Sequence, residues 1–151
     1  MKIGLGSDHG GYNLKEAIKK HLQEKGYQYV DYGTNSSESV DYPAFGMKVA
    51  EAVVSGECEY GILCCGTGIG ISISANKVPG VRCAAVSDTF SAQMSKEHNN
   101  ANILALGERV IGVGLALQIV DVWLNSEFLG ERHARRVNMI GDIEKKYSME
   151  E

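Results

Sequence analysis

Short apolar runs alternate along the chain with longer stretches whose apolar residues recur every three or four positions. The runs predict buried strands at Lys2–Gly6, Tyr27–Val30, Tyr60–Cys64, Val81–Val86 and Ile103–Leu106. The longer stretches predict helices at Asn13–Lys25, Pro43–Gly56, a first turn at Ile71–Asn76, Ser87–Glu97, and about Gly112–Leu124 and Glu131–Tyr147. Strands that alternate with helices predict a parallel sheet covered on both faces, a three-layer α/β/α sandwich.

Local signals agree with these boundaries. Gly26 closes the first helical stripe, and Pro43 suits the first turn of the second helix. Ser87 or Asp88 can cap the helix that follows the fourth strand. No repeat, low-complexity tract or linker divides the chain, so we expect residues 1–151 to form one domain.

Composition narrows the function classes. The chain has 151 residues, of which 44% are apolar and 23% charged, as is ordinary for a soluble globular protein. Its net charge of -4 argues against nucleic-acid binding, which normally needs a basic face. The N-terminus leads into the first strand without a signal segment, and no apolar run is long enough to span a bilayer. We therefore expect a cytoplasmic protein with no membrane partner.

The cysteines fit a reducing compartment. Cys58, Cys64, Cys65 and Cys83 show neither CxxC spacing nor the Cys/His pattern of a zinc site. Adjacent cysteines rarely form a disulfide with each other. We interpret Cys58 and Cys83 as packing residues and expect free thiols, which persist in reducing compartments.

The segment Cys65-Gly66-Thr67-Gly68-Ile69-Gly70 carries the strongest chemical signal. It places a thiol at the carboxyl end of the third strand, the end at which open α/β sheets bind ligands. The glycines uncover backbone N–H groups, and these, with a helix N-terminus, favour thiolate over thiol. Cys65 is thus a candidate base or nucleophile, and Cys64 should pack on the opposite face of the sheet. A glycine-rich turn around an inert cysteine explains this segment equally well.

Further polar residues follow the predicted strands and helices. They are Asp8, His9, Tyr42, His98, Asn99, Arg109, Arg132, Arg135 and Arg136. Singly, Asp8 can cap a helix, His98 can complement a helix dipole, and the arginines of the last helix can form a solvated face. His21 and His133 are treated as structural. Together, a thiol, histidines, a carboxylate and arginines that converge on strand ends suit a small phosphorylated substrate handled by proton transfer.

Motifs spread over nearly the whole chain carry a family resemblance. They are Gly6-Ser7-Asp8-His9-Gly10, Asp41-Tyr42-Pro43, Cys65–Gly70, Ala75-Asn76-Lys77, His98-Asn99, Gly107-Glu108-Arg109-Val110 and Arg132-His133-Ala134-Arg135-Arg136-Val137. With them the sequence closely resembles the type B ribose-5-phosphate isomerases, which share a fold with the galactose-6-phosphate isomerase subunits. The resemblance implies a Rossmann-like sheet of five parallel strands in the order 2-1-3-5-4. It also implies a homodimer or a dimer of such dimers, with no metal or organic cofactor.

Two details place the chain within that family. One branch uses a glutamate in the helix after the glycine-rich segment as its base, whereas this chain has Cys65 and, at the matching helix position, Ile71. It therefore resembles the cysteine branch. In the two-subunit galactose-6-phosphate isomerases the functional residues are divided between different chains. Here Cys65, His98, Arg132 and Arg136 occur together, which favours a self-sufficient homo-oligomeric pentose isomerase.

The implied enzyme is an intramolecular oxidoreductase of the non-oxidative pentose phosphate pathway. It interconverts D-ribose 5-phosphate and D-ribulose 5-phosphate through an enediolate. The resemblance assigns ring opening to His98, removal of the C2 proton to Cys65, and proton transfer between the two oxygens to Thr67. It assigns substrate binding to Asp8, His9, Tyr42, Gly66, Gly68, Ile69, Gly70, Asn99, Arg109, Arg132 and Arg136, and leaves Arg135 on the surface. It also implies that His98, Asn99 and Arg109 reach into the site that holds the partner subunit's Cys65.

Other functions stay open at this point. An isomerase of a six-carbon sugar phosphate, such as allose 6-phosphate or galactose 6-phosphate, would differ in pocket depth, which sequence does not show. A non-catalytic sugar-phosphate or nucleotide sensor would need neither Cys65 nor His98. A thiol redox protein would need a second cysteine at redox-motif spacing.

Overall fold

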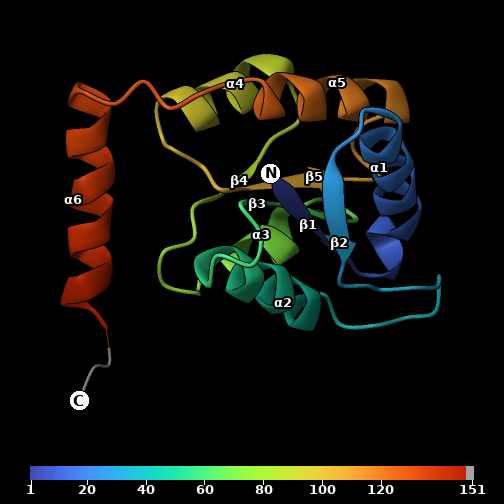
Figure 1. The fold of residues 1–151 in the computed structure, drawn as a ribbon. Helices are drawn as coiled ribbons and strands as arrows, with labels where there is room; N and C mark the ends of the chain where they lie inside the picture. The colour runs from blue at the N-terminus through green and yellow to red at the C-terminus, as the bar shows by residue number, and fades with distance from the viewer. Residues whose placement is uncertain (149–151) are drawn as a thin grey trace.

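A parallel sheet forms the centre of the molecule (Figure 1). The computed structural model describes residues 1–148. The strands are β1 (Lys2–Ser7), β2 (Gln28–Asp31), β3 (Tyr60–Cys65), β4 (Cys83–Ala85) and β5 (Ile103–Gly107). They pair in parallel in the order β2-β1-β3-β5-β4, which confirms the predicted fold class and strand order.

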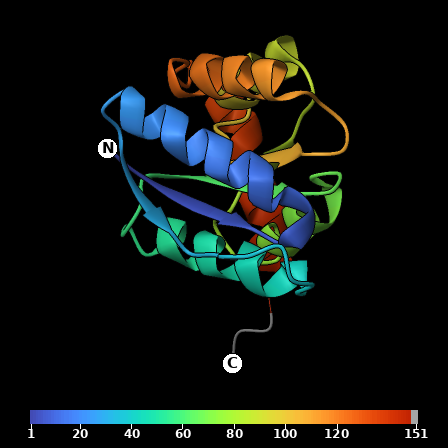
Figure 2. The same cartoon turned by 90° about the vertical axis from the view of Figure 1, so that its right-hand side faces the viewer.

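Helices cover both faces of this sheet. They are α1 (Tyr12–Glu24), α2 (Tyr42–Val54), α3 (Ile69–Ala75), α4 (Thr89–Glu97), α5 (Val113–Leu124) and α6 (Arg132–Lys146). α1, α4 and α5 lie on one face, and α2 and α3 lie on the other (Figures 1 and 2). Each predicted helix and strand is present within two residues at either end. A short 3-10 turn, η1 (His9–Gly11), was not predicted.

Each face of the sheet has its own hydrophobic core, and the two adjacent cysteines separate them. Cys64 packs with side chains of α1 and α5, whereas Cys65 packs on the other face with α2 and α3. This confirms the predicted alternation of the two side chains. Burial raises the pKa of the Cys64 thiol well above its ordinary value, so Cys64 is a packing residue rather than a reactive one.

Two glycines let the loops at the carboxyl edge of the sheet approach one another. A Cβ atom on Gly11 would lie 2.4 Å from the carbonyl carbon of Cys64, and one on Gly107 would lie 2.6 Å from the carbonyl carbon of Thr67. Neither space admits a side chain. Both glycines therefore press backbone onto the Cys65–Gly70 segment and fix its position.

The last helix stands beyond the β4 edge of the sheet (Figures 1 and 2). His133 is the only residue that α6 buries within the part of the chain described. Near its far end, the Glu144 carboxylate accepts a hydrogen bond from the Gly80 amide at 3.1 Å. Between α6 and the sheet edge lies a hollow of about 440 Å³ whose lining includes Arg82 and Ile140. α6 is thus held at few points and leaves most of its surface exposed.

None of the helices within residues 1–148 has both the length and the apolar character that crossing a bilayer requires.

Candidate active site

The carboxyl edge of the sheet gathers the larger set of predicted site residues. We call this set the cysteine group: Asp8, His9, Tyr42, Cys65–Gly70 and Arg109. Asp8 and His9 follow β1, Cys65 ends β3, and Arg109 follows β5. Because β1 and β5 flank β3, these strand ends are neighbours.

Cys65 is held by the backbone of its own loop. Its side chain is buried, and its Sγ accepts a hydrogen bond from the Gly68 amide at 3.1 Å. Gly68 takes the left-handed conformation, with φ of 80°, which turns its N–H back toward the sulfur. An N–H donor aimed at sulfur stabilises negative charge there, as a base needs.

The rest of the loop supplies further donors. The Ile69 amide donates to Thr67 Oγ1 at 3.1 Å, so this N–H and that of Gly68 are already used. The amides of Gly66, Thr67 and Gly70 donate to no other group of residues 1–148. Three free N–H groups in the loop that follows a thiol are suited to bind an oxyanion.

Asp8 and His9 are oriented by hydrogen bonds within the chain. Asp8 caps η1, because its Oδ1 accepts the Gly11 amide at 3.1 Å. His9 Nδ1 accepts the Val40 amide at 3.1 Å. The neutral imidazole therefore carries its proton on Nε2, which makes that nitrogen a donor.

Arg109 lies in the cysteine group of its own chain. Its amide donates to the Gly66 carbonyl at 3.0 Å, and a Cβ on Gly66 would lie 3.2 Å from its guanidinium. The preceding Glu108 accepts the Leu14 amide at 2.7 Å and so ties this loop to the first turn of α1. The expectation that Arg109 belongs with His98 is therefore wrong: β5 ends beside Cys65, and the residues that follow stay there.

Three predicted residues form the outer walls of this group. Tyr42 begins α2, and its ring lies so close to Gly70 that a Cβ there would be 2.8 Å from a ring carbon. Thr67 and Ile69 line a hollow of about 190 Å³ with residues at the ends of β4 and β5. The Tyr42 and Ile69 side chains are themselves exposed.

The remaining predicted residues lie elsewhere, and we call them, with His133, the histidine group: His98, Asn99, Arg132, His133 and Arg136. α4 starts after the carboxyl end of β4 and crosses the face of the sheet to the amino end of β5. His98 caps the end of α4, whereas Cys65 pairs with Gly107 at the far end of β5. The five residues of β5 separate those edges by about 13 Å.

Within one chain, the predicted convergence at the strand ends is therefore wrong for His98, Asn99, Arg132 and Arg136. Asn99 lines the hollow between α6 and the amino end of β4. Arg132 and Arg136 lie on the first turns of α6. A helix that links two parallel strands must return across the sheet, so its last residues reach the amino edge.

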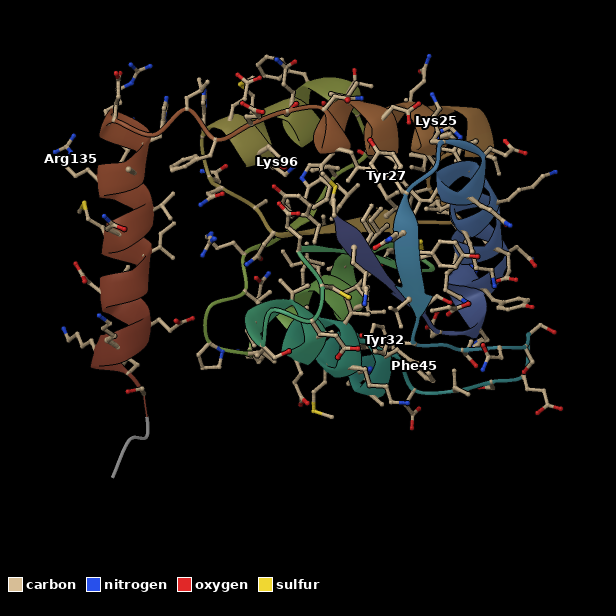
Figure 3. The ribbon with its side chains drawn as sticks, viewed as in Figure 1. Lys25, Tyr27, Tyr32, Phe45, Lys96 and Arg135 are labelled. Atoms are coloured by element: carbon tan, nitrogen blue, oxygen red, sulfur yellow. The ribbon has the colours of Figure 1, made fainter. Side chains whose placement is uncertain are left out.

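The histidine group is built around two stacked rings. The His98 and His133 imidazoles lie face to face, with centroids 4.1 Å apart and planes inclined by 8°. Burial lowers the pKa of His133, and the charges of His98, Arg132 and Arg136 lower it further. The sequence predicted a structural role for His133 but not its contact with His98, since a histidine inside an arginine-rich turn gives no signal of its ring partner. Arg135 points away from the sheet (Figure 3), as expected of a surface residue.

Lys96 anchors this end of α4 to the body of the protein. It lies between α4 and the sheet (Figure 3) and is 2% exposed. Its Nζ donates to the carbonyls of Trp123 at 3.0 Å and Ser126 at 3.3 Å, and lies 3.9 Å from the centre of the Tyr60 ring. Burial lowers the pKa of Lys96 to about 8. The lysine joins the helix that ends in His98 to the segment that leads into α6.

Over residues 1–148, no three His, Cys, Asp or Glu side chains are grouped so that they could hold a metal ion.

Comparisons with known proteins identify the family. The model of the family described as Ribose/Galactose Isomerase matches residues 3–140, which span both groups. The chain belongs to the ribose/galactose isomerase family. Ribose-5-phosphate isomerase B of Escherichia coli is 50% identical over 96% of this chain and 97% of that protein. The solved structure of Clostridium thermocellum ribose-5-phosphate isomerase B is 66% identical, covers 98% of this chain and 100% of its own, and has a TM-score of 0.97.

The family also contains enzymes with other names. The galactose-6-phosphate isomerase subunit LacB of Clostridium acetobutylicum is 44% identical over 85% of this chain and 74% of that protein.

Proposed function

We propose that this protein is an aldose–ketose isomerase that interconverts D-ribose 5-phosphate and D-ribulose 5-phosphate. The observation that carries the proposal is the buried Cys65 thiol held by the Gly68 amide beside three free N–H groups. Two relatives of this chain, at 50% and 66% identity, are named ribose-5-phosphate isomerase B. They support the choice of a five-carbon substrate.

The cysteine group carries the proton transfer. The Cys65 thiolate removes the proton from C2 to give an enediolate, and the thiol then returns a proton to C1 to complete the ketose. The amides of Gly66, Thr67 and Gly70 donate to the developing oxyanion; one such donor is typically worth about 3 kcal/mol. The Gly68 amide stays with the sulfur, and Ile69 contributes as a wall. Thr67 Oγ1 moves a proton between the two substrate oxygens, and Asp8 binds sugar hydroxyls.

Ring opening needs the histidine group, which one chain holds at the opposite edge of its sheet. We therefore propose that His98 of a partner subunit acts as the acid/base for ring opening, with the partner's Asn99 binding the substrate oxygens. In a two-fold dimer each chain gives this group and receives it. Arg109 acts from the same chain as Cys65.

Exposed apolar side chains of α6 support a second copy as that partner. Met139, Ile140 and Ile143 on this helix, and Tyr147 directly after it, are each about half exposed or more. A helix that shows an apolar stripe to solvent usually packs against another chain. We infer a homodimer, or a dimer of such dimers, with this stripe in its interface.

His9 and Arg109 bind the phosphate end together with the partner's Arg132 and Arg136. Arg132 and Arg136 lie one turn apart at the start of α6, where two guanidinium groups can hold one phosphate. His9 presents Nε2–H as a donor, and Tyr42 closes the pocket on the side of Gly70. This arrangement needs no cofactor.

The substrate implies the setting. Interconversion of these two pentose phosphates belongs to the non-oxidative pentose phosphate pathway. The cysteines of the described chain, Cys58, Cys64, Cys65 and Cys83, are free thiols, which suits the cytoplasm, where we place the reaction.

A substrate panel tests the proposal. Isomerisation rates are measured with the five-carbon ribose 5-phosphate and with the six-carbon allose 6-phosphate and galactose 6-phosphate. We expect the highest kcat/KM with ribose 5-phosphate. A preference for galactose 6-phosphate would favour the second candidate, a six-carbon isomerase, to which the galactose-6-phosphate isomerase subunit is a precedent. Binding without turnover of any sugar phosphate would indicate a sensor.

A further inference from the structure

His133 and His98 form a pair that the reaction as described does not explain. α6 contributes fifteen residues and buries His133 alone within the described chain, at 7% exposed. That one side chain lies flat on the imidazole of His98, with centroids 4.1 Å apart. Among the described residues, the one buried side chain of α6 therefore packs against the His98 ring at the end of α4.

Two imidazoles in this geometry restrict each other. Face-to-face packing fixes the plane of the His98 ring, which otherwise turns about its side-chain bonds at the open end of a helix. Stacked like charges repel, so the pair holds one proton more readily than two. Four ionisable groups face His133: His98, Arg132, Arg136 and Glu131. The first three lower the pKa of His133, and Glu131 raises it.

Position near a helix start adds to this effect. His133 is the second residue of α6, at the positive end of the helix dipole, where a cation is disfavoured. Burial and the neighbouring positive charges both lower the pKa of His133. Both effects disfavour a positive charge on His133.

We propose that His133 is a positioning residue for ring opening, whose ring holds the His98 ring in its working orientation. This rests on the proposed function, because it takes His98 as the acid/base. Arg132 and Arg136, on the same turns of α6, then bind phosphate while His133 orients the adjacent ring.

Kinetics of three variants separate positioning from stability. His133→Ala removes the stack, and we expect kcat for ribose 5-phosphate to fall about 10- to 100-fold while KM stays within about 3-fold. His133→Phe keeps a flat ring and should recover kcat to within about 5-fold of the unaltered protein. His21→Ala is the control: this histidine also pairs across helices, with Asp121 at 2.7 Å, but lies away from α6 and should leave kcat within about 2-fold.

Equal losses of kcat in the Ala and Phe variants would overturn the proposal. So would an unchanged kcat in His133→Ala, or a change confined to KM, which would mean that His133 acts through the phosphate-binding arginines. Thermal unfolding is measured for all three variants. It shows whether a loss of kcat arises because the variant is less stable rather than because the His98 ring is misplaced.

A measurement without substrate keeps this test apart from the proposed function. Histidine ring resonances are followed against pH by NMR in the unaltered protein and in His98→Asn. We expect the pKa of His133 to rise when His98 is replaced, because a like charge is removed. An unchanged pKa of His133 would contradict the coupling. If the pKa rises but no sugar phosphate is isomerised, the pair exists and the proposed function fails.

Discussion

The cysteine group and the histidine group are built in different ways. In the cysteine group the backbone does most of the positioning: Gly11 and Gly107 press against the Cys65–Gly70 segment, and the Gly68 amide holds the sulfur. In the histidine group side chains do it, through the ring pair of His98 and His133 and the buried amine of Lys96. One is part of the sheet, and the other depends on a helix that stands beyond the sheet edge.

This difference fits two halves of a shared site. A base that removes a carbon-bound proton needs a fixed position against an oxyanion hole, which close backbone contacts provide. A group that approaches from another chain has to project from its own, and an exposed helix with an apolar stripe does so. The cysteine group has a base and N–H donors but no ring-opening histidine, and the histidine group has the reverse.

The largest effect is expected from the sulfur. Cys65→Ala should lower kcat at least about 1,000-fold with little change in KM, because the thiolate acts mainly in the transition state. Steady-state kinetics with ribose 5-phosphate measures this. Cys64→Ala is the matched control, one residue away in the opposite core, and should leave kcat within about 3-fold. An essential Cys64 beside a dispensable Cys65 would show that the wrong thiol has been assigned.

A smaller effect, on binding, is expected from α6. Arg132→Ala and Arg136→Ala should each raise KM about 10- to 100-fold, since each removes a charge-assisted contact to phosphate. Arg135→Ala, on the outward side of the same helix, should change KM by less than about 2-fold. The same small effect for all three would make α6 a solvated face and leave the histidine group without its phosphate contacts.

The smallest effect concerns the pH dependence of stability. The pKa of Lys96 is lowered to about 8 in the folded protein, from an ordinary 10.5, so between these values the unfolded chain binds the proton more tightly. Lys96 therefore costs stability below pH 8, and this cost disappears as pH rises toward 10.5. The difference in free energy of unfolding between the unaltered protein and Lys96→Met should change in favour of the unaltered protein by on the order of 2–3 kcal/mol over that range.

Urea unfolding at several pH values measures that difference. Lys20→Met, at an exposed lysine of α1, is the control and should show a constant difference. A constant difference for Lys96→Met as well would mean that the amine is not buried as described, and that α4 and the α5–α6 segment are joined in another way.

The sequence predicted the fold almost completely because its signals are local. Apolar periodicity located each strand and helix, and side-chain alternation placed Cys64 and Cys65 in separate cores. Asp88 caps α4 as its position suggested, accepting the Ser91 amide at 2.6 Å. The turn at His9–Gly11 was missed because it depends on the Asp8 side chain rather than on periodicity.

The candidate site was predicted as a set of residues but not as an arrangement. Arg109 was grouped with His98, although β5 lies beside β3 and so delivers Arg109 to Cys65. His133 was interpreted as structural, because nothing local shows that the start of α6 meets the end of α4. Such contacts depend on where a distant helix packs, which residue patterns do not encode.

The two-chain site itself can be tested by complementation. Cys65→Ala and His98→Asn are each expected to be inactive alone, and are mixed in equal amounts under conditions in which subunits exchange. In a mixed dimer one site receives both lesions and the other receives neither, so random mixing should restore about a quarter of the activity of the unaltered protein. If fully mixed dimers stay as inactive as their parents, Cys65 and His98 act from the same chain and the shared site is contradicted.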